Sequence, residues 1–233
     1  ILLQMPAKNA LKIYIENGYY HIYNRGVEKR NIFADRQDYS VFLAYLKEYL
    51  TPKNKNNLLL KLSEEGLIWE EKDKILRLLR LNNFHDQLDL LSYSLMPNHF
   101  HFLVKQKGPN VIDSFTRSLM TRYVMYFNRK NSRIGPLFQG VYKAVLITSE
   151  EQLLHLSRYI HNNPLRLAKN QKESQDLYTS LPEFLGKRRT DWVKPDDIIS
   201  HFSKSNPLNS YRSFVDESED IASLKDILIE PLE

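Results

Sequence analysis

The amino-acid sequence predicts an α+β protein with a ferredoxin-like split βαβ core. We expect a central, mostly antiparallel sheet of four to five strands, helices on one face, and a C-terminal helical extension. One observation behind this prediction is the order of hydrophobic patterns along the chain, which runs strand, helix, strand, strand, helix, strand, helix. The other is the very short turn between the second and third strands, which favours antiparallel pairing of the two.

The first strand and helix are followed by an insertion. An aromatic and β-branched stretch bounded by glycines predicts a strand over residues 18–26. Apolar residues at helical spacing then predict a helix from Asp38, taken as its cap, to Leu50. Residues 52–85 are charged and rich in leucine, so we expect them to form an inserted loop with one helix over 72–81.

The middle of the chain predicts a hairpin. Residues 89–95 form the second strand, residues 96–98 the turn, and residues 99–105 the third strand. Proline at position 97 suits the turn because it has no N–H to donate to a strand ladder.

The remaining core elements are a helix, a strand and a second helix. Apolar residues three and four apart predict a long amphipathic helix over 111–131, and a fourth strand follows at 142–147. A capping box at Ser149 starts the last core helix, which we expect to stop at Pro164.

The chain divides into a main domain and an extension. We expect the main domain to span residues 5–169, starting at Met5 and including the 52–85 insertion. Residues 170–233 form an accessory extension, in which short helices are predicted at 181–185, 198–202 and 211–215.

Composition excludes several function classes. The chain has no cysteine, which rules out disulfide scaffolds, thiolate zinc sites and cysteine nucleophiles and fits a reducing compartment. No apolar run reaches the ~18 residues that a membrane span needs, and no phosphate-cradling GxxxxGK[ST] loop is present. We therefore expect a cytoplasmic, nucleoid-associated protein with no membrane and no nucleotide cofactor.

The charge distribution is polarised. Residues 101–170 hold 11 Lys or Arg against 3 Asp or Glu, a net charge of +8. Residues 171–233 hold 8 against 13, a net charge of −5. A basic middle segment suggests contact with a polyanion such as nucleic acid, although a solvated basic face accounts for the same count.

Two motifs have spacings that would allow metal binding or nucleophilic attack. His99 and His101 lie two apart on a predicted strand, so both imidazoles point to one face and can meet one divalent cation. Tyr159 and Asn163 lie four apart on a predicted helix and share one of its faces. A phenol can attack phosphorus, and an amide oxygen suits a magnesium-like ion. Packing alone explains each motif equally well.

The combination of these motifs resembles a known family, the REP-associated tyrosine transposases of the single-tyrosine HUH, insertion-sequence-200-like group. The phrases that carry the resemblance are YYHIYNRGVEKRNIFAD, SLMPNHFHFLV, GPLFQGVYKAVLI and LSRYIHNNPLR, in that order. The tail YTSLPEFLG…DWV…YRSFV is similar to the extension of longer members. The resemblance runs from Met5 over nearly the whole chain except the 52–85 insertion.

The resemblance implies a function and a set of site residues. His99 and His101 fall on the family's metal-binding histidines, Asn163 on the third metal ligand, and Tyr159 on the nucleophile. Such enzymes use Mg²⁺ or Mn²⁺ to cut single-stranded DNA near a hairpin, leaving a 5′-phosphotyrosine and a free 3′-OH. The resemblance therefore implies a DNA-binding transposase that nicks and rejoins DNA and whose partner is single-stranded DNA with a REP hairpin.

Tyr159 must lose a proton near neutral pH although the pKa of a phenol is ~10. Arg158, His155 and the metal are candidates for promoting this. Relatives often have an acidic residue where His155 stands, so His155 is a possible modulator with a structural role as the alternative. Relatives also often have Arg at the position of Val141, which leaves Lys143 to supply the positive charge of that phrase.

Further residues are candidates for DNA contacts. Basic side chains near the motifs can neutralise phosphates, and polar groups of the first phrase can reach base edges. These candidates are Asn24, Arg25, Arg30, Arg117, Arg122, Arg129, Lys130, Arg133 and Lys143. Tyr123, Phe127 and Phe138 could stack on unpaired bases, with core packing the favoured alternative. No role is assigned to His21, His85, His161 or His201.

Two other functions compete with this one. A non-catalytic DNA- or RNA-hairpin-binding protein is the main alternative, because a four-stranded sheet with aromatic residues and basic helices also describes RNA-recognition modules. A metal hydrolase of small molecules is disfavoured by the basic surface and by the lack of carboxylates near the histidines. The sequence leaves open a monomer or a homodimer, and a tyrosine that serves its own chain or its partner's.

Overall fold

The core of the protein is a four-stranded antiparallel sheet. A computed structural model describes residue 12 and residues 14–169 and 178–217. The predicted start at Met5 and parts of the extension lie outside these described residues. The strands lie in the order β2-β3-β1-β4, which is the ferredoxin-like order. Their bounds are Tyr19–Arg25 for β1, Leu88–Met96 for β2, His99–Gln106 for β3 and Lys143–Ile147 for β4. The predicted fold class is confirmed.

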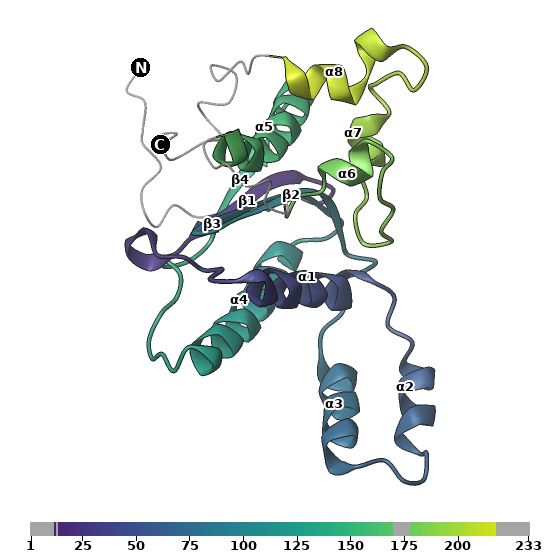
Figure 1. Cartoon of the computed structure of the whole chain (residues 1–233). Coiled ribbons are helices and arrows are strands. Elements are labelled where there is room, and N and C mark those ends of the chain that lie inside the picture. The colour runs from purple at the N-terminus through teal and green to yellow at the C-terminus, as the bar shows by residue number, and fades with distance from the viewer. Residues whose placement is uncertain (1–11, 13, 170–177, 218–233) are drawn as a thin grey trace.

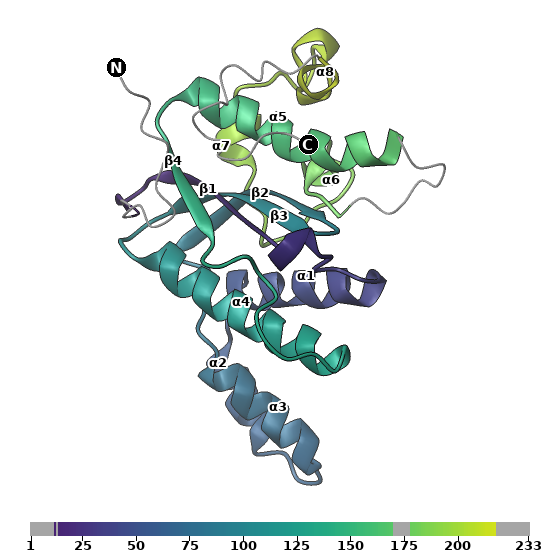
Figure 2. The same ribbon diagram turned by 90° about the vertical axis from the view of Figure 1, so that its left-hand side faces the viewer.

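Helices cover both faces of this sheet, whereas the sequence suggested one. Helices α1 (Arg36–Leu50) and α4 (Val111–Lys130) lie on one side, and α5 (Glu150–Lys169) lies on the other (Figures 1 and 2). The reason is that both faces of the central strands are apolar enough to need cover. Five consecutive residues of β3, 100–104, are buried, so hydrophobic alternation could not reveal a solvent-facing side.

Two hydrophobic clusters result, one on each side of the sheet. Phe100 and Phe102 of β3 point into the larger cluster, with Phe42 of α1 and Phe115 of α4. Leu103, one residue on, points into the second cluster beneath α5. This alternation places odd-numbered residues of β3 on the α5 side.

The predicted start of α1 and the predicted end of α5 both need correction. Asp35, not Asp38, caps α1: its side chain accepts a hydrogen bond from the Asp38 backbone N–H. Asp38 lies in the first turn, and its carboxylate accepts from the N–H of Ala34. Helix α5 does not stop at Pro164 but continues past it to Lys169, since proline removes a single N–H donor and a helix can run through it. At the other end, Ser149 Oγ accepts from the Gln152 N–H, as the predicted capping box requires, but the Gln152 side chain accepts from the Thr148 N–H instead of the Ser149 N–H, so only half of the predicted box forms.

The 52–85 segment forms a helical hairpin that extends away from the sheet (Figure 1). Helix α3 (Trp69–Arg80) is close to the predicted helix at 72–81. The stretch expected to be a loop contains a second helix, α2 (Lys55–Leu62), capped by Asn54. The sequence around Asn54 shows little helical periodicity because α2 is short and has no buried residues.

The extension packs against α5 and the edge of the sheet. It contains helices α6 (Leu181–Phe184), α7 (Asp196–Ile199) and α8 (Tyr211–Asp216). The first and third agree with the predicted helices, and α7 starts two residues before the predicted one. Isolated bridges from Val193 to Leu90 and from Thr179 to Ser94 join the extension to β2. Two short 3-10 turns, Val27–Lys29 and Pro207–Asn209, complete the described elements.

No helix in the described part of the chain is long and apolar enough to cross a membrane.

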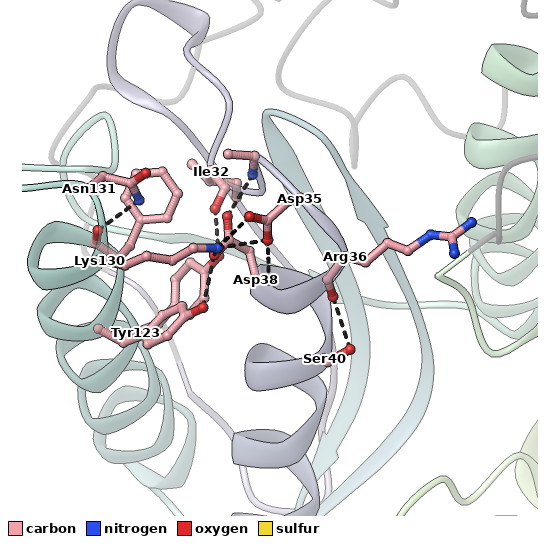
Figure 3. A network of polar contacts seen from close by, with 11 residues as sticks. Ile32, Asp35, Arg36, Asp38, Ser40, Tyr123, Lys130 and Asn131 are labelled. Atoms are coloured by element: carbon pink, nitrogen blue, oxygen red, sulfur yellow. Dashed lines mark hydrogen bonds and ion pairs between the residues drawn. The ribbon is translucent and has the colours of Figure 1, made fainter.

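A buried carboxylate links α1 to α4 on the face of the sheet opposite α5 (Figure 3). Asp38 is fully buried and accepts hydrogen bonds from Lys130 Nζ at 2.7 Å and from the Tyr126 hydroxyl at 3.0 Å. Lys130 also pairs with Asp35, and these bonds raise its pKa although burial opposes them. Ile32, just before α1, accepts from the Tyr123 hydroxyl of α4. The network fixes the start of α1 against the last turns of α4.

Removal of the Asp38 carboxylate should destabilise the protein. The substitution Asp38→Ala leaves the Ala34 N–H and the Tyr126 hydroxyl without their acceptor. It also removes one of the two carboxylates that pair with Lys130. We expect the free energy of unfolding in urea to fall by about 2–4 kcal/mol. Arg129→Ala, an exposed neighbour of Lys130 on α4, is the control and should change it by less than about 0.5 kcal/mol. Equal losses for both variants would contradict this account.

A second buried chain of hydrogen bonds links α8, α5 and β2. The Tyr211 hydroxyl donates to Ser157 Oγ, so His161 Nδ1 must donate to the Tyr211 oxygen, at 2.7 Å. His161 Nε2 therefore accepts from Ser180 Oγ at 2.8 Å. Ser180 Oγ in turn accepts from the backbone N–H of Tyr93 in β2. His161 is fully buried and neutral, and burial lowers its pKa to about 3.

The buried His161 should make stability depend on pH. The unfolded chain binds a proton at His161 near pH 6.5, whereas the folded protein resists protonation down to about pH 3. Stability is therefore lost as the pH falls between these values, by roughly 1.4 kcal/mol per pH unit from this one group. His161→Gln should flatten that slope relative to the wild type in chelator-treated protein, and the surface variant His85→Gln should not. Parallel slopes for wild type and His161→Gln would refute this role.

Candidate active site

Three of the predicted motif residues, His99, His101 and Tyr159, meet on the α5 side of the sheet. On β3, His99 and His101 point to this face, as does Leu103. On β1, Tyr23 lies directly opposite His101 in the strand register, and His21 is its diagonal neighbour. Helix α5 runs over this face and carries Tyr159. The site is thus built from two central strands and one helix.

Tyr159 packs directly on the His-x-His pair of its own chain. Its ring lies edge-to-face on the His101 ring, with centroids 5.5 Å apart and an interplanar angle of 84°. Tyr159 is 6% exposed and belongs to the hydrophobic cluster beneath α5, with Leu156 and Ile160. The phenol therefore lies at the boundary between that cluster and the imidazoles, so no second subunit is needed to bring them together.

His99 is held from the turn that precedes it. Its Nδ1 lies 2.6 Å from Oδ1 of Asn98, and its ring meets the His101 ring edge-to-face with centroids 5.0 Å apart. An amide oxygen only accepts, so the imidazole donates here through Nδ1. His99 is partly exposed and marks the open end of the site.

His101 is the buried member of the pair. Its Nδ1 lies 2.8 Å from Nε2 of His21, and its Nε2 is buried with no hydrogen-bond partner among the described residues. Burial, and then the proximity of His99 and His21, lower the pKa of His101 well below 6.5. The imidazole is therefore neutral, which is the form that binds metals.

Asn163 lies one helical turn after Tyr159 on α5. Its Nδ2 is also buried without a partner in the described part of the chain. Groups of three or more His, Cys, Asp or Glu suited to a metal are absent from the described residues. The possible ligands are instead the imidazole nitrogens of His99 and His101 and the side-chain oxygen of Asn163, and the unpartnered Nε2 of His101 is the observation that fits a divalent ion.

Two cationic residues lie on the same face. Lys143 of β4 pairs with Tyr23 in the register and its Nζ lies 5.5 Å from the centroid of the Tyr23 ring. Arg25 of β1 pairs with His99 in the register and donates to Oε1 of Gln139. Positive charge therefore follows the strands next to both histidines.

His155 and Arg158 contact helix α8 of the extension. The Arg158 guanidinium contacts His155 Nδ1 at 2.9 Å, donates to the Phe214 carbonyl and lies over the Phe214 ring. His155 also meets that ring edge-to-face. These contacts with α8 give both residues a structural role, which is the alternative stated above for His155.

The remaining DNA-contact candidates lie mostly away from this face. Helix α4, on the opposite side of the sheet, carries Arg117, Arg122, Arg129 and Lys130 (Figure 1). Arg117 pairs with Asp113, Arg122 with Glu48, and Lys130 with Asp35 and Asp38, while Arg129 is exposed.

Three further candidates make contacts within the chain. Arg30 pairs with Glu28, Arg133 reaches Asn128, and the buried Asn24 bonds to the Gly140 carbonyl. Tyr123, Phe127 and Phe138 are buried in the larger cluster, which is the packing role favoured for them.

Sequence reasoning missed the contribution of β1 to the site. His21 and Tyr23 carried no assigned role, yet their rings stack with centroids 4.7 Å apart and both stack near His101. The two-residue spacing of His21 and Tyr23 in a predicted strand was the available signal. It could not be used without knowing that β1 lies beside β3.

The site thus combines two histidines of one strand with a tyrosine on the helix that overlies it. The family described as "Transposase IS200 like" matches residues 58–163, slightly less than half of the chain. This segment holds His99, His101, Tyr159 and Asn163, so the resemblance to this family is confirmed over that part of the chain. The match also includes most of the α2–α3 hairpin and leaves out β1.

Two solved structures are similar to this chain. One is a REP-associated tyrosine transposase bound to a REP hairpin, with 12% identity and a TM-score of 0.44 over 80% of this chain and 92% of that one. The other is a protein assigned as a transposase from Deinococcus radiodurans R1, with 16% identity and a TM-score of 0.28 over 66% of this chain and 96% of that one. No curated protein matches the chain.

Proposed function

We propose that this protein is a metal-dependent single-stranded DNA endonuclease and strand transferase of the REP-associated kind, which cuts near DNA hairpins through Tyr159. The observation that carries the proposal is the contact of the Tyr159 ring with the His101 ring inside one chain. A binding protein has no need for a phenol beside a neutral, partly unpartnered imidazole pair. The same contact favours a tyrosine that serves its own chain, in a monomer or in either half of a dimer.

His99, His101 and Asn163 are the residues that would hold Mg²⁺ or Mn²⁺. When bound, such an ion polarises a non-bridging phosphate oxygen and offsets its charge, a contribution of several kcal/mol. The neutral state of His101 and its buried, unpartnered Nε2 support this assignment. The amide oxygen of Asn163 suits both ions, whereas the two imidazoles suit Mn²⁺ better than Mg²⁺, which prefers oxygen ligands.

The reaction at Tyr159 is an exchange of one ester for another. The phenol oxygen attacks phosphorus and its proton leaves, while the bond from phosphorus to the 3′ oxygen breaks and that oxygen departs with the electron pair and gains a proton. The products are a 5′-phosphotyrosine and a free 3′-OH. A second 3′-OH can reverse the attack, so strands are rejoined without a nucleotide cofactor.

Positive charge near the site would position the DNA backbone. Lys143 and Arg25 lie on the site face, next to Tyr23 and His99 respectively, so we place the phosphates of the cut strand there. The basic residues of α4 that are candidates for DNA contacts would touch only DNA that reaches the face of the sheet opposite α5. In this scheme residues 5–169 carry the chemistry, and residues 170–233 support α5.

The salt dependence of DNA binding should identify the face that is used. A variant that removes one phosphate contact lowers the slope of log Kd against log salt by about 1. We expect this for Lys143→Gln and for Arg25→Gln with a single-stranded oligonucleotide carrying a hairpin. Arg129→Gln, an exposed residue of α4, should leave the slope unchanged. The reverse pattern would place the DNA on α4.

Capture of the covalent intermediate tests the proposed activity directly. The full chain is incubated with a hairpin oligonucleotide from the DNA that flanks its gene, with Mn²⁺, with Mg²⁺ or with EDTA. We expect an adduct that resists denaturing gels, depends on the metal, and maps by mass spectrometry to the peptide containing Tyr159. Tyr159→Phe should abolish it.

The control is Tyr126→Phe, which removes a hydroxyl on the opposite side of the sheet and should retain the adduct. An adduct on Tyr23, which also stacks near His101, would keep the chemistry and overturn the choice of nucleophile. Hairpin binding of undiminished strength with no adduct under either metal would favour the non-catalytic binding protein.

A further inference from the structure

The strongest unassigned feature is a buried pair of imidazoles, His21 on β1 and His101 on β3. His21 is fully buried and His101 is 5% exposed, and His21 Nε2 lies 2.8 Å from His101 Nδ1. Two neutral imidazoles can share only one proton along such a line, so one nitrogen is the donor and the other the acceptor. The direction of this bond decides which nitrogen of His101 carries the lone pair.

The two directions have opposite consequences at His101 Nε2. If His21 donates, His101 carries its proton on Nε2, where it would be a buried N–H with no partner among the described residues. If His101 donates through Nδ1, its Nε2 carries a lone pair that faces the α5 side. Only the second arrangement leaves a nitrogen that can bind a cation.

We propose that His21 is a positioning residue that accepts the Nδ1 proton of His101 and so holds the Nε2 lone pair of that imidazole toward the site. This inference rests on the metal site in the proposed function and extends it to a second layer of residues. Partners of this kind fix the tautomer and ring orientation of metal-binding histidines, and their loss typically lowers metal affinity 10- to 100-fold.

The other histidine of the motif supports the same arrangement. His99 Nδ1 lies 2.6 Å from Asn98 Oδ1, an oxygen that can only accept, so His99 also carries its proton on Nδ1. With His21 as acceptor, both imidazoles of the motif have the same tautomer and both have a bare Nε2. The Nδ1 proton of the partly exposed His99 is therefore accepted by an amide oxygen, and the Nδ1 proton of the buried His101 is accepted by the imidazole of His21.

The tautomer can be measured without metal or DNA. Nitrogen-15 NMR of the chelator-treated full chain, labelled at histidine, distinguishes a protonated ring nitrogen from a bare one. We expect His101, assigned by comparison with His101→Gln, to carry its proton on Nδ1 and His21 to carry its proton away from Nε2. A protonated Nε2 on His101 in the wild type would overturn the proposal whether or not the protein cuts DNA.

Metal binding supplies the second readout. Mn²⁺ affinity is measured by electron paramagnetic resonance titration for wild type, His21→Phe and His21→Gln. Phe keeps a planar ring and removes the acceptor, so we expect a 10- to 100-fold weaker Kd. Gln keeps an acceptor oxygen, so we expect the Kd to stay within about threefold of wild type and the His101 tautomer to be retained. His85→Gln, a surface histidine, is the matched control and should not change the Kd.

Failure of this inference is distinguishable from failure of the proposed function. If His21→Phe folds and binds Mn²⁺ as tightly as wild type, the positioning role is wrong and the metal site stands. If wild type binds no Mn²⁺, the metal site itself is wrong and the positioning role fails with it. Should His21→Phe not fold, the wild-type tautomer of His101 still decides the matter.

Discussion

The two-residue period of β3 is the constraint on which both cores and the site depend. Phe100 and Phe102 point into the cluster under α1 and α4, and His99 and His101 point to the opposite side, beneath α5. A shift of one residue would move the two imidazoles into the phenylalanine-rich cluster under α1 and α4 and would move Phe100 and Phe102 to the α5 side. The cost of that exchange fixes the register, and the register brings the histidines to Tyr159.

The extension determines where α5 lies and therefore where Tyr159 lies. His161, two residues after the tyrosine, joins Tyr211 of α8 to Ser180, which is bonded to β2. Arg158, one residue before the tyrosine, reaches the Phe214 carbonyl of α8. Buried polar groups of this kind are costly unless all are satisfied, so the helix is held in one position on the sheet.

The strands and long helices could be predicted because their patterns are local. Hydrophobic spacing located all four strands, and the two motifs at His99 and Tyr159 contributed to the resemblance to a known family. What could not be predicted depends on pairing between distant segments. The role of His21 needs β1 beside β3, and the internal ion pair of Lys130 needs α1 beside α4. Sequence also could not show that both sheet faces are covered, since five consecutive buried residues have no polar side.

The proposed reaction requires one ion that is shared by two imidazoles and an amide oxygen next to the phenol of the same chain. Anomalous diffraction from crystals of the full chain grown with Mn²⁺ would locate this ion. The account predicts one manganese peak in bonding contact with Nε2 of both His99 and His101, with Asn163 at the third position and the Tyr159 oxygen facing the ion. Manganese bound elsewhere, or a Tyr159 oxygen turned away into the cluster under α5, would contradict it.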